Sequence, residues 1–237
     1  MIETEWEVMG KRKGEKMYEY VTKAEYQPIR KEIETIIRKV RSYMRTHYKV
    51  KFQDQLIGSG KRHLITRIVK GNSGYDFDYN LIISAPKKGE GNHPKKLKQQ
   101  FIEAFSYALK GTKYSAPQDS TSAITIKVID KKHSKVLHSC DFAIIYYEND
   151  SPNNGYYYLK NNKSQKQYLF EYRNLSRNID VKLEQILSIS NGWILVRDEY
   201  IKLKNNNKDI NKHSFSLYLE AINNVYNSLP GKRKKAL

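Results

Sequence analysis

The stretch GYDFDYNLII, Gly74 to Ile83, places two aspartates one residue apart in front of an apolar run. The run Leu-Ile-Ile indicates a buried β-strand, although aspartate itself is a poor strand former. Side chains at positions i and i+2 of a strand project to the same face, so Asp76 and Asp78 point the same way. Two carboxylates this close repel each other unless a cation lies between them. The stretch therefore predicts either a metal site or, more simply, solvated acids at the beginning of a strand.

A third acid suits the same site. Asp141 stands directly before the apolar run FAIIYY, in the same relation to its strand as Asp76 and Asp78 have to theirs. Magnesium prefers hard oxygen ligands, usually one or two carboxylates with waters and substrate phosphates. Two such ions about 4 Å apart can activate an attacking hydroxyl and stabilise a leaving pyrophosphate. Because the chain has ten aspartates, a D-x-D pair also arises by chance, and the pair alone is weak support.

The stretch GSGK, Gly58 to Lys61, supplies a second element of a phosphate site. Glycine lets backbone N–H groups approach a phosphate chain, and the Ser59 hydroxyl can reach a phosphate oxygen. Lys61 and Arg62 follow and add positive charge. The stretch is not a P-loop, because the G-x-x-x-x-G-K-[ST] spacing is absent. Alone it is a weak motif, and its weight comes from its place upstream of the aspartates.

The rest of the chain divides into an α/β part followed by a helical part. Apolar residues at helical spacing predict one long amphipathic helix over residues 22–47. A short strand or a loop is predicted over residues 50–58, and strands over 63–69, 75–84, 122–130 and 136–147. A hairpin is predicted over 156–172, and helices over 95–111, 178–190, 192–205 and 214–229. This order indicates an α+β protein.

The composition bounds the class of partner. The chain has 43 Lys and Arg against 25 Asp and Glu, a net charge of +18. Such an excess suits RNA or another nucleic acid, nucleotides, or another polyanion such as an acidic membrane surface. Frequent Lys, Asn, Ile and Tyr also occur in proteins from AT-rich genomes, where lysine is common without a binding role. The chain lacks an apolar run long enough to span a membrane and a signal peptide, which predicts a cytoplasmic protein. The single cysteine, Cys140, excludes an internal disulfide and suits a buried core position.

Together these motifs resemble the polymerase-beta-like nucleotidyltransferase superfamily. The pattern IGSG…VKGNSGYDFDYNLII…SAITIKV…HSCDFAII combines a Gly-Ser turn, a D-x-D strand and a third acidic strand. The chain is most similar to the group of cyclic GMP-AMP synthase, oligoadenylate synthase and the bacterial CD-NTases. The long helix before Gly58 resembles that group's spine helix, and GWILVRDEYIKLKNNNKDINKHSFSLYLEAI resembles its C-terminal helices. The resemblance covers residues 22–229, with a longer gap between Ser59 and Asp76 than in many relatives.

The resemblance implies a fold and a metal site. The fold would be a nucleotidyltransferase-fold mixed sheet with a long N-terminal helix and a C-terminal helical lobe, with a cleft between them. Residues 1–174 would form the catalytic core and residues 175–237 the helical lobe. Asp76, Asp78 and Asp141 would hold two Mg²⁺ ions, with Mn²⁺ as the alternative ion. Asp141 would also help to deprotonate the attacking hydroxyl.

The same resemblance implies how a nucleoside triphosphate is bound. Gly58 and Ser59 would contact the triphosphate from the core, and Arg197 and Ser214 from the helical lobe. Lys204, on the same helix as Arg197, is a weaker candidate for a phosphate contact. Without the resemblance, Arg197 reads as a surface arginine of a helix and Ser214 as a helix N-cap.

Two classes of function follow. In the first, the chain is a metal-dependent nucleotidyltransferase that uses nucleoside triphosphate, releases pyrophosphate and makes a cyclic or short oligonucleotide signal. The runner-up within this class is transfer of a nucleotide to RNA, a small molecule or a protein. In the second class, the fold serves a basic nucleic-acid-binding protein without catalysis. Three clustered carboxylates argue against the second class, since they weaken the binding of a polyanion.

Overall fold

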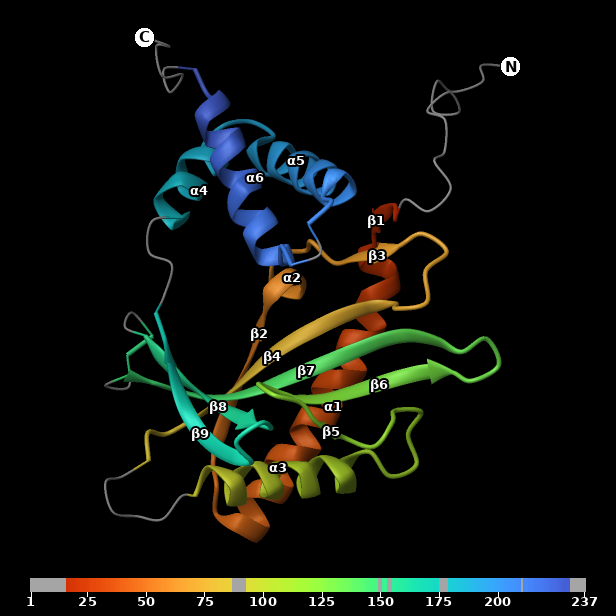
Figure 1. Ribbon diagram of the computed structural model, residues 1–237, viewed down its shortest axis with the longest axis vertical. Helices are drawn as coiled ribbons and strands as arrows, with labels where there is room; N and C mark the ends of the chain where they lie inside the picture. Colours follow the sequence, from red (N-terminus) through yellow and green to blue (C-terminus); the bar gives the residue numbers. More distant parts are fainter. Residues whose placement is uncertain are drawn as a thin grey trace.

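The computed structural model describes residues 16–86, 93–148, 151–152, 155–174, 179–209 and 211–230. Along the chain its elements are β1 Tyr18–Tyr20, α1 Lys23–Tyr48, β2 Phe52–Ile57, α2 Gly58–Lys61, β3 Thr66–Ile68, β4 Tyr75–Ile83, α3 Pro94–Ala108, β5 Gln118–Asp119, β6 Ile124–Asp130, β7 Lys135–Tyr147, β8 Tyr156–Asn162, β9 Gln167–Arg173, α4 Ile179–Leu187, α5 Gly192–Asn206 and α6 Ser214–Ser228. Figure 1 shows a twisted sheet backed by α1 and α3, with α4, α5 and α6 gathered at one end of the molecule. The predicted α+β class and the mixed sheet are confirmed.

The long predicted helix is α1. Thr22 and Glu25 form a capping box, in which each side chain accepts a hydrogen bond from the other residue's backbone N–H. One face of α1 is buried along its whole length, through Tyr26, Ile33, Ile36, Ile37, Val40 and Met44. This stripe packs with α3 and the sheet in one hydrophobic cluster. The helix thus forms the rigid support on which the sheet lies.

The main sheet brings distant parts of the chain together. Its strand order is β2-β4-β7-β6-β5, and β8 pairs with the end of β7 and with β9. β4 and β7 run parallel, whereas the other strand pairs described in this sheet are antiparallel. Every second residue of β4, from Tyr75 to Ile83, is buried on the side of α1 and α3. That alternation leaves Asp76 and Asp78 on the opposite face, as predicted.

Two local predictions were wrong in detail. The strand expected over residues 63–69 is limited to Thr66–Ile68 and pairs with β1 in a separate two-stranded sheet. β1 was not predicted, because three residues are too short to show a period. The GSGK turn is the single-turn helix α2, which Figure 1 shows between the sheet and the helical end.

The helical end has a core of its own. Side chains of α4, α5 and α6 form a second hydrophobic cluster, built on residues such as Ile186, Val196 and Ile222. Leu64 is buried in this cluster and Tyr20 packs against it, although both belong to the N-terminal part of the chain. The predicted boundary between residues 174 and 175 adjoins residues 175–178, outside the described residues, and it stays a prediction. The basic tail 231–237 lies outside them too.

In the described part of the chain, no helix combines the length and the apolar character that crossing a membrane requires. Cys140 is buried in β7, as expected for a core position.

Candidate active site

The pairing of β4 with β7 brings the three predicted acids onto one patch of the sheet. Asp78 lies directly opposite Asp141 in the parallel ladder, and Asp76 lies opposite Ser139. Neighbouring strands are about 4.8 Å apart, so the backbones of Asp78 and Asp141 are separated by one strand spacing. The sequence predicted that these acids share a site, and the register places their residues side by side.

Each carboxylate leans toward a different neighbour. Asp141 Oδ1 accepts a hydrogen bond of 2.5 Å from the Thr125 hydroxyl on β6, on the side away from β4. Asp78 leans the other way, toward β2, since a Cβ atom on Gly58 would lie 2.4 Å from Asp78 Oδ2. The Ser139 hydroxyl donates to Asp76 Oδ1. The carboxylates of Asp78 and Asp141 thus lean toward opposite neighbours, Gly58 and Thr125.

The charges of the acids raise one another's pKa. Burial, together with the carboxylates of Asp141 and Asp76, raises the pKa of Asp78 to about 6, and the guanidinium of Arg62 opposes this shift. Burial also raises the pKa of Asp141, while the hydrogen bond from Thr125 lowers it. Both carboxylates are therefore held in a state that a cation would stabilise.

A divalent metal ion fits this set of oxygen ligands. Three carboxylates on one patch, two of them with raised pKa, match the hard-oxygen preference of Mg²⁺ and Mn²⁺. Among the described residues, no three His, Cys, Asp or Glu side chains converge closely enough to hold an ion as they stand. The directions of the two side chains account for this, because Asp78 leans toward Gly58 and Asp141 toward Thr125 on the same face of the sheet.

The Gly58 turn lies against this patch. Gly58 has φ +62°, in the left-handed region that favours glycine, and its missing side chain leaves room for Asp78. Ser59 follows in α2 and is half-buried. Arg62, at the end of α2, donates a 2.9 Å hydrogen bond to the Gly58 carbonyl. The turn therefore places Gly58, Ser59 and a cation beside Asp78.

Arg62 also connects this turn to the helical end. Its guanidinium lies 4.6 Å from the ring centroid of Tyr218 and 5.4 Å from that of Phe215, both on α6. Cations stack favourably on aromatic rings in this way. Phe215 is 45% exposed, so the contact with Arg62 leaves part of this residue accessible.

The predicted residues of the helical end lie at the junction with the core. Arg197 donates a 3.0 Å hydrogen bond to the His63 carbonyl and lies 4.3 Å from the centroid of the Tyr20 ring. Lys204 donates a 2.7 Å hydrogen bond to the Thr66 hydroxyl. Burial lowers the pKa of Lys204 to about 8, and the negative charge of Asp76 opposes this shift. Arg197 is thus a contact between the two parts of the chain and not a free surface arginine.

Ser214 opens α6, but the N-cap is His213, and no capping hydrogen bond is made by the His213 side chain. The interpretation of Ser214 as an N-cap is therefore wrong. Ser214 instead lies one residue inside the helix, next to the exposed Phe215.

Comparison with known proteins shows which fold this is. No protein-family model and no curated protein matches the sequence. The structure is similar to that of a mutant of the Vibrio cholerae di-nucleotide cyclase DncV, with a TM-score of 0.61 at 11% identity over 89% of this chain and 70% of that chain. The chain has the fold of the CD-NTases.

Two further structures agree. CdnG, the CD-NTase of Bradyrhizobium diazoefficiens, is similar with a TM-score of 0.55 at 12% identity, over 90% of this chain and 67% of that chain. CdnC of E. coli MS115-1, in its complex with HORMA-deltaN, has a TM-score of 0.53 at 13% identity, over 89% of this chain and 61% of that chain. DncV was solved with ATP and GTP, and CdnG with GTP. At these identities the likeness establishes the CD-NTase fold, and the chain spans only about two thirds of these proteins.

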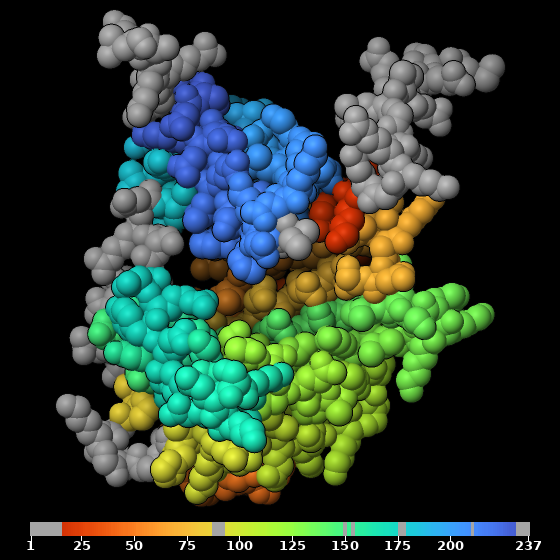
Figure 2. All heavy atoms as spheres, in the orientation of Figure 1, coloured from red at the N-terminus to blue at the C-terminus, as the bar shows by residue number. Residues whose placement is uncertain are grey.

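The CD-NTase fold of this chain has a hollow at the helical end. A cavity of about 770 Å³ is lined by Lys204 and Ser214 together with Lys16, Tyr18, Asn205, Asn206, Asn207, Lys208, Asp209, Lys212 and Leu217. Four lysines against one aspartate make this cavity positively charged. The acids, Gly58 and Ser59 do not line it. Figure 2 also shows a groove between the blue helices and the green strands, and orange and yellow segments of the core are visible inside it.

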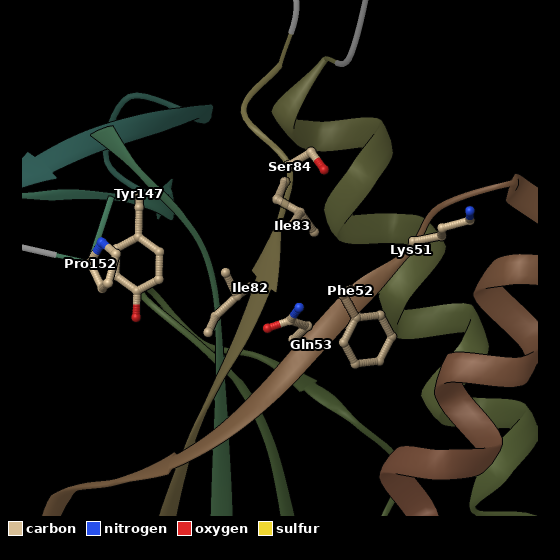
Figure 3. A pocket seen from close by; sticks show the side chains of 8 residues that line it. All are labelled: Lys51, Phe52, Gln53, Ile82, Ile83, Ser84, Tyr147 and Pro152. Carbon is tan, nitrogen blue, oxygen red and sulfur yellow. The ribbon is translucent and has the colours of Figure 1, made fainter. Parts of the chain in front are cut away.

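A second hollow lies where β2 begins and β4 ends. It has a volume of about 410 Å³, and Figure 3 shows Ile82 and Gln53 between Tyr147 and Pro152 on one side and Phe52 and Lys51 on the other. Ile82 lies four residues beyond Asp78 along β4, so this hollow is separate from the acids.

Three residues beside the acids were not assigned from the sequence: Arg62, Thr125 and Ser139. From the sequence, Arg62 was noted only as an added positive charge. Its position three residues after Ser59 could have indicated a cation beside the Gly58 turn. Ser139 precedes Asp141 by two residues, so strand alternation places both on one face. Thr125 could be found only through the pairing of β6 with β7.

Proposed function

We propose that the chain is a metal-dependent nucleotidyltransferase that uses nucleoside triphosphate and releases pyrophosphate. One observation carries the proposal: Asp78 and Asp141 occupy paired positions on adjacent strands, with Asp76 beside them and the Gly58 turn against Asp78. The CD-NTase fold supports it, and so do the nucleotides bound to DncV and CdnG. By the same support, the product is a cyclic or short oligonucleotide.

In this proposal the acids bind metal and accept a proton. Asp76, Asp78 and Asp141 hold Mg²⁺ or Mn²⁺, which when bound polarises the phosphate and lowers the pKa of an attacking hydroxyl. Asp141 Oδ1 is taken by the Thr125 hydroxyl, so Oδ2 is the oxygen free to accept the proton of that hydroxyl.

The basic residues bind the triphosphate. Gly58 and Ser59 contact it from the core, and Arg62 is close enough to Asp78 to bind a phosphate there. From the helical end, Lys204 and Ser214 line a positively charged cavity, which suits a polyphosphate. Arg197 contributes by keeping the helical end against the core through His63.

The net charge of +18 favours a second ligand. A protein with this excess binds polyanions, so RNA is an activator or, in the alternative function, the acceptor of the nucleotide. Transfer to a small molecule or a protein is the other form of this alternative. A binding protein without catalysis fits less well, because it gains nothing from buried acids that repel one another. Location in the cytoplasm stays a prediction.

The test is the fate of labelled nucleotides. Purified protein is incubated with each α-labelled triphosphate, alone and in pairs, with Mg²⁺ or Mn²⁺ and with or without RNA. Mass spectrometry of the product separates a cyclic oligonucleotide from extended RNA. Asp76→Ala with Asp78→Ala should abolish turnover, whereas Asp198→Ala, an exposed aspartate of α5, should not. The proposal is wrong if no triphosphate is consumed under any of these conditions and the double variant binds triphosphate as the wild type does.

A further inference from the structure

Lys98 is a lysine that reaches neither solvent nor the hollows of the molecule. It lies on α3, is 1% exposed, and belongs to a residue type that is almost never fully buried unless it is paired. Its ammonium group donates to the Ala123 carbonyl at 2.9 Å and to the Ser120 carbonyl at 3.4 Å. Burial lowers the pKa of Lys98, while the nearby Asp119 raises it. Lys98 therefore ties α3 to the turn between β5 and β6.

Asp119 completes the partners of Lys98. Its Oδ1 lies 3.4 Å from the Lys98 ammonium, and its Oδ2 accepts hydrogen bonds from the Asn161 amide at 3.0 Å and the Tyr168 hydroxyl at 2.6 Å. The ion pair is thereby connected to the β8–β9 hairpin. A methionine would fill the same space without the cost of burying a charge, so a polar role accounts better for lysine at this position.

The turn held by Lys98 leads directly to the acids. Ser120 Oγ lies 2.8 Å from Thr125 Oγ1, and Thr125 Oγ1 lies 2.5 Å from Asp141 Oδ1. A hydroxyl carries one hydrogen, and an ionised carboxylate can only accept, so Thr125 donates to Asp141. Ser120 must then donate to Thr125. The hydrogen bonds run in one direction, from the turn held by Lys98 to one oxygen of Asp141.

We propose that Ser120 and Thr125, held in place by Lys98, are positioning residues that fix the orientation of Asp141. This inference rests on the proposed function of Asp141. Thr125 occupies Oδ1 and turns Oδ2 toward the patch shared with Asp78. Partners of this kind, one step behind a metal ligand, typically change metal affinity or activity by about 10- to 100-fold.

Thr125 is tested with two substitutions of similar size. Thr125→Val removes the hydroxyl and keeps the branched shape, whereas Thr125→Ser keeps the hydroxyl. We expect Thr125→Val to lower kcat, and separately the affinity for Mn²⁺ measured by electron paramagnetic resonance without nucleotide, by about 10- to 100-fold. KM for the triphosphate should stay within twofold. Thr125→Ser should restore both quantities to within threefold of the wild type.

Lys98 is tested against an exposed lysine of the same helix. Lys98→Met should lower Mn²⁺ affinity, and adding Thr125→Val should lower it little further, because residues of one network are not additive. Lys95→Met, on the exposed face of α3, should have no effect. If Lys98→Met fails to fold, Ser120→Ala replaces it, with the exposed Ser122→Ala as its control.

Two results would overturn the inference. One is Mn²⁺ affinity in Thr125→Val within threefold of the wild type, and the other is failure of Thr125→Ser to restore it, which would assign the effect to packing. Failure of the proposed function gives a different result from these two, because it is seen as the absence of triphosphate turnover in the wild type. If the wild type consumes no triphosphate, the Mn²⁺ titration still decides the role of Thr125, and a wild type that does not bind Mn²⁺ overturns the inference as well.

Discussion

Replacing Gly58 by alanine tests whether this turn sets the position of the Asp78 carboxylate. A Cβ atom at Gly58 would lie 2.4 Å from Asp78 Oδ2, while an ordinary contact begins near 3.4 Å. The carboxylate must therefore move by about 1 Å, because the far end of a side chain yields more easily than the backbone. A misplacement of about 1 Å near reacting groups can cost about 100-fold in rate. That loss corresponds to about 2.7 kcal/mol of activation free energy.

Gly111→Ala is the matched control. Gly111 has φ +73°, close to the +62° of Gly58, and a Cβ atom there would meet nothing within 4 Å. An L residue in the left-handed region costs about 1–2 kcal/mol, and the stiffer unfolded chain offsets about 0.4–1 kcal/mol of that. Gly111→Ala should therefore lose about 1 kcal/mol of unfolding free energy and Gly58→Ala at least as much, since the clash with Asp78 adds to the strain, and only Gly58→Ala should lose turnover.

The assay combines urea unfolding with pyrophosphate release at saturating triphosphate. The expected result is a kcat about 100-fold lower in Gly58→Ala and within twofold of the wild type in Gly111→Ala. Turnover of Gly58→Ala within threefold of the wild type would refute the reasoning. Equal losses of turnover in the two variants would show that backbone strain, and not displacement of Asp78, is responsible.

Three further predictions concern charge. Asp78→Asn should raise the unfolding free energy at pH 7.5 in EDTA by about 1–2 kcal/mol, because burial and two neighbouring carboxylates disfavour the charged form of Asp78. A variant less stable than the wild type would contradict this. Burial lowers the pKa of His138 to about 4. As the pH falls below 6.5, the unfolded state therefore binds a proton that the folded state does not, and the free energy of unfolding decreases between pH 6.5 and 4. His138→Gln removes this loss, so its stability relative to the wild type should rise by about 2 kcal/mol from pH 7 to pH 4.5 in thermal or urea unfolding, and an unchanged difference would count against it. Lys204→Met should raise KM for triphosphate about tenfold or more, with kcat within threefold of the wild type. Lys202→Met, at an exposed lysine of the same helix, should change neither quantity. Equal effects of the two substitutions would show that Lys204 is not part of the site.

Local patterns predicted most of the elements. The helix expected over residues 22–47 begins and ends within one residue of α1, and the hairpin expected over residues 156–172 is β8 and β9. These predictions succeed because capping, helical spacing and turn residues act over a few positions. β1 was missed, because a three-residue strand exists only through its partner β3.

The site was predicted in part for the same reason. Asp76, Asp78, Asp141 and Gly58 could be named from motifs, whereas the contacts that orient them could not. The hydrogen bond from Thr125 to Asp141 spans 16 residues, and that from Arg197 to His63 spans 134. A pattern in a short window carries no information on such contacts.

The sequence by itself determined that Asp76 and Asp78 share one face of a strand, because strand side chains alternate with a period of two. It also determined which residues could carry the chemistry. Only the tertiary structure decided that Asp141 lies opposite Asp78 and that the two carboxylates lean apart, toward Thr125 and toward Gly58. Strand order and register depend on packing between segments far apart in the chain, and the direction of a carboxylate depends on what that packing places beside it.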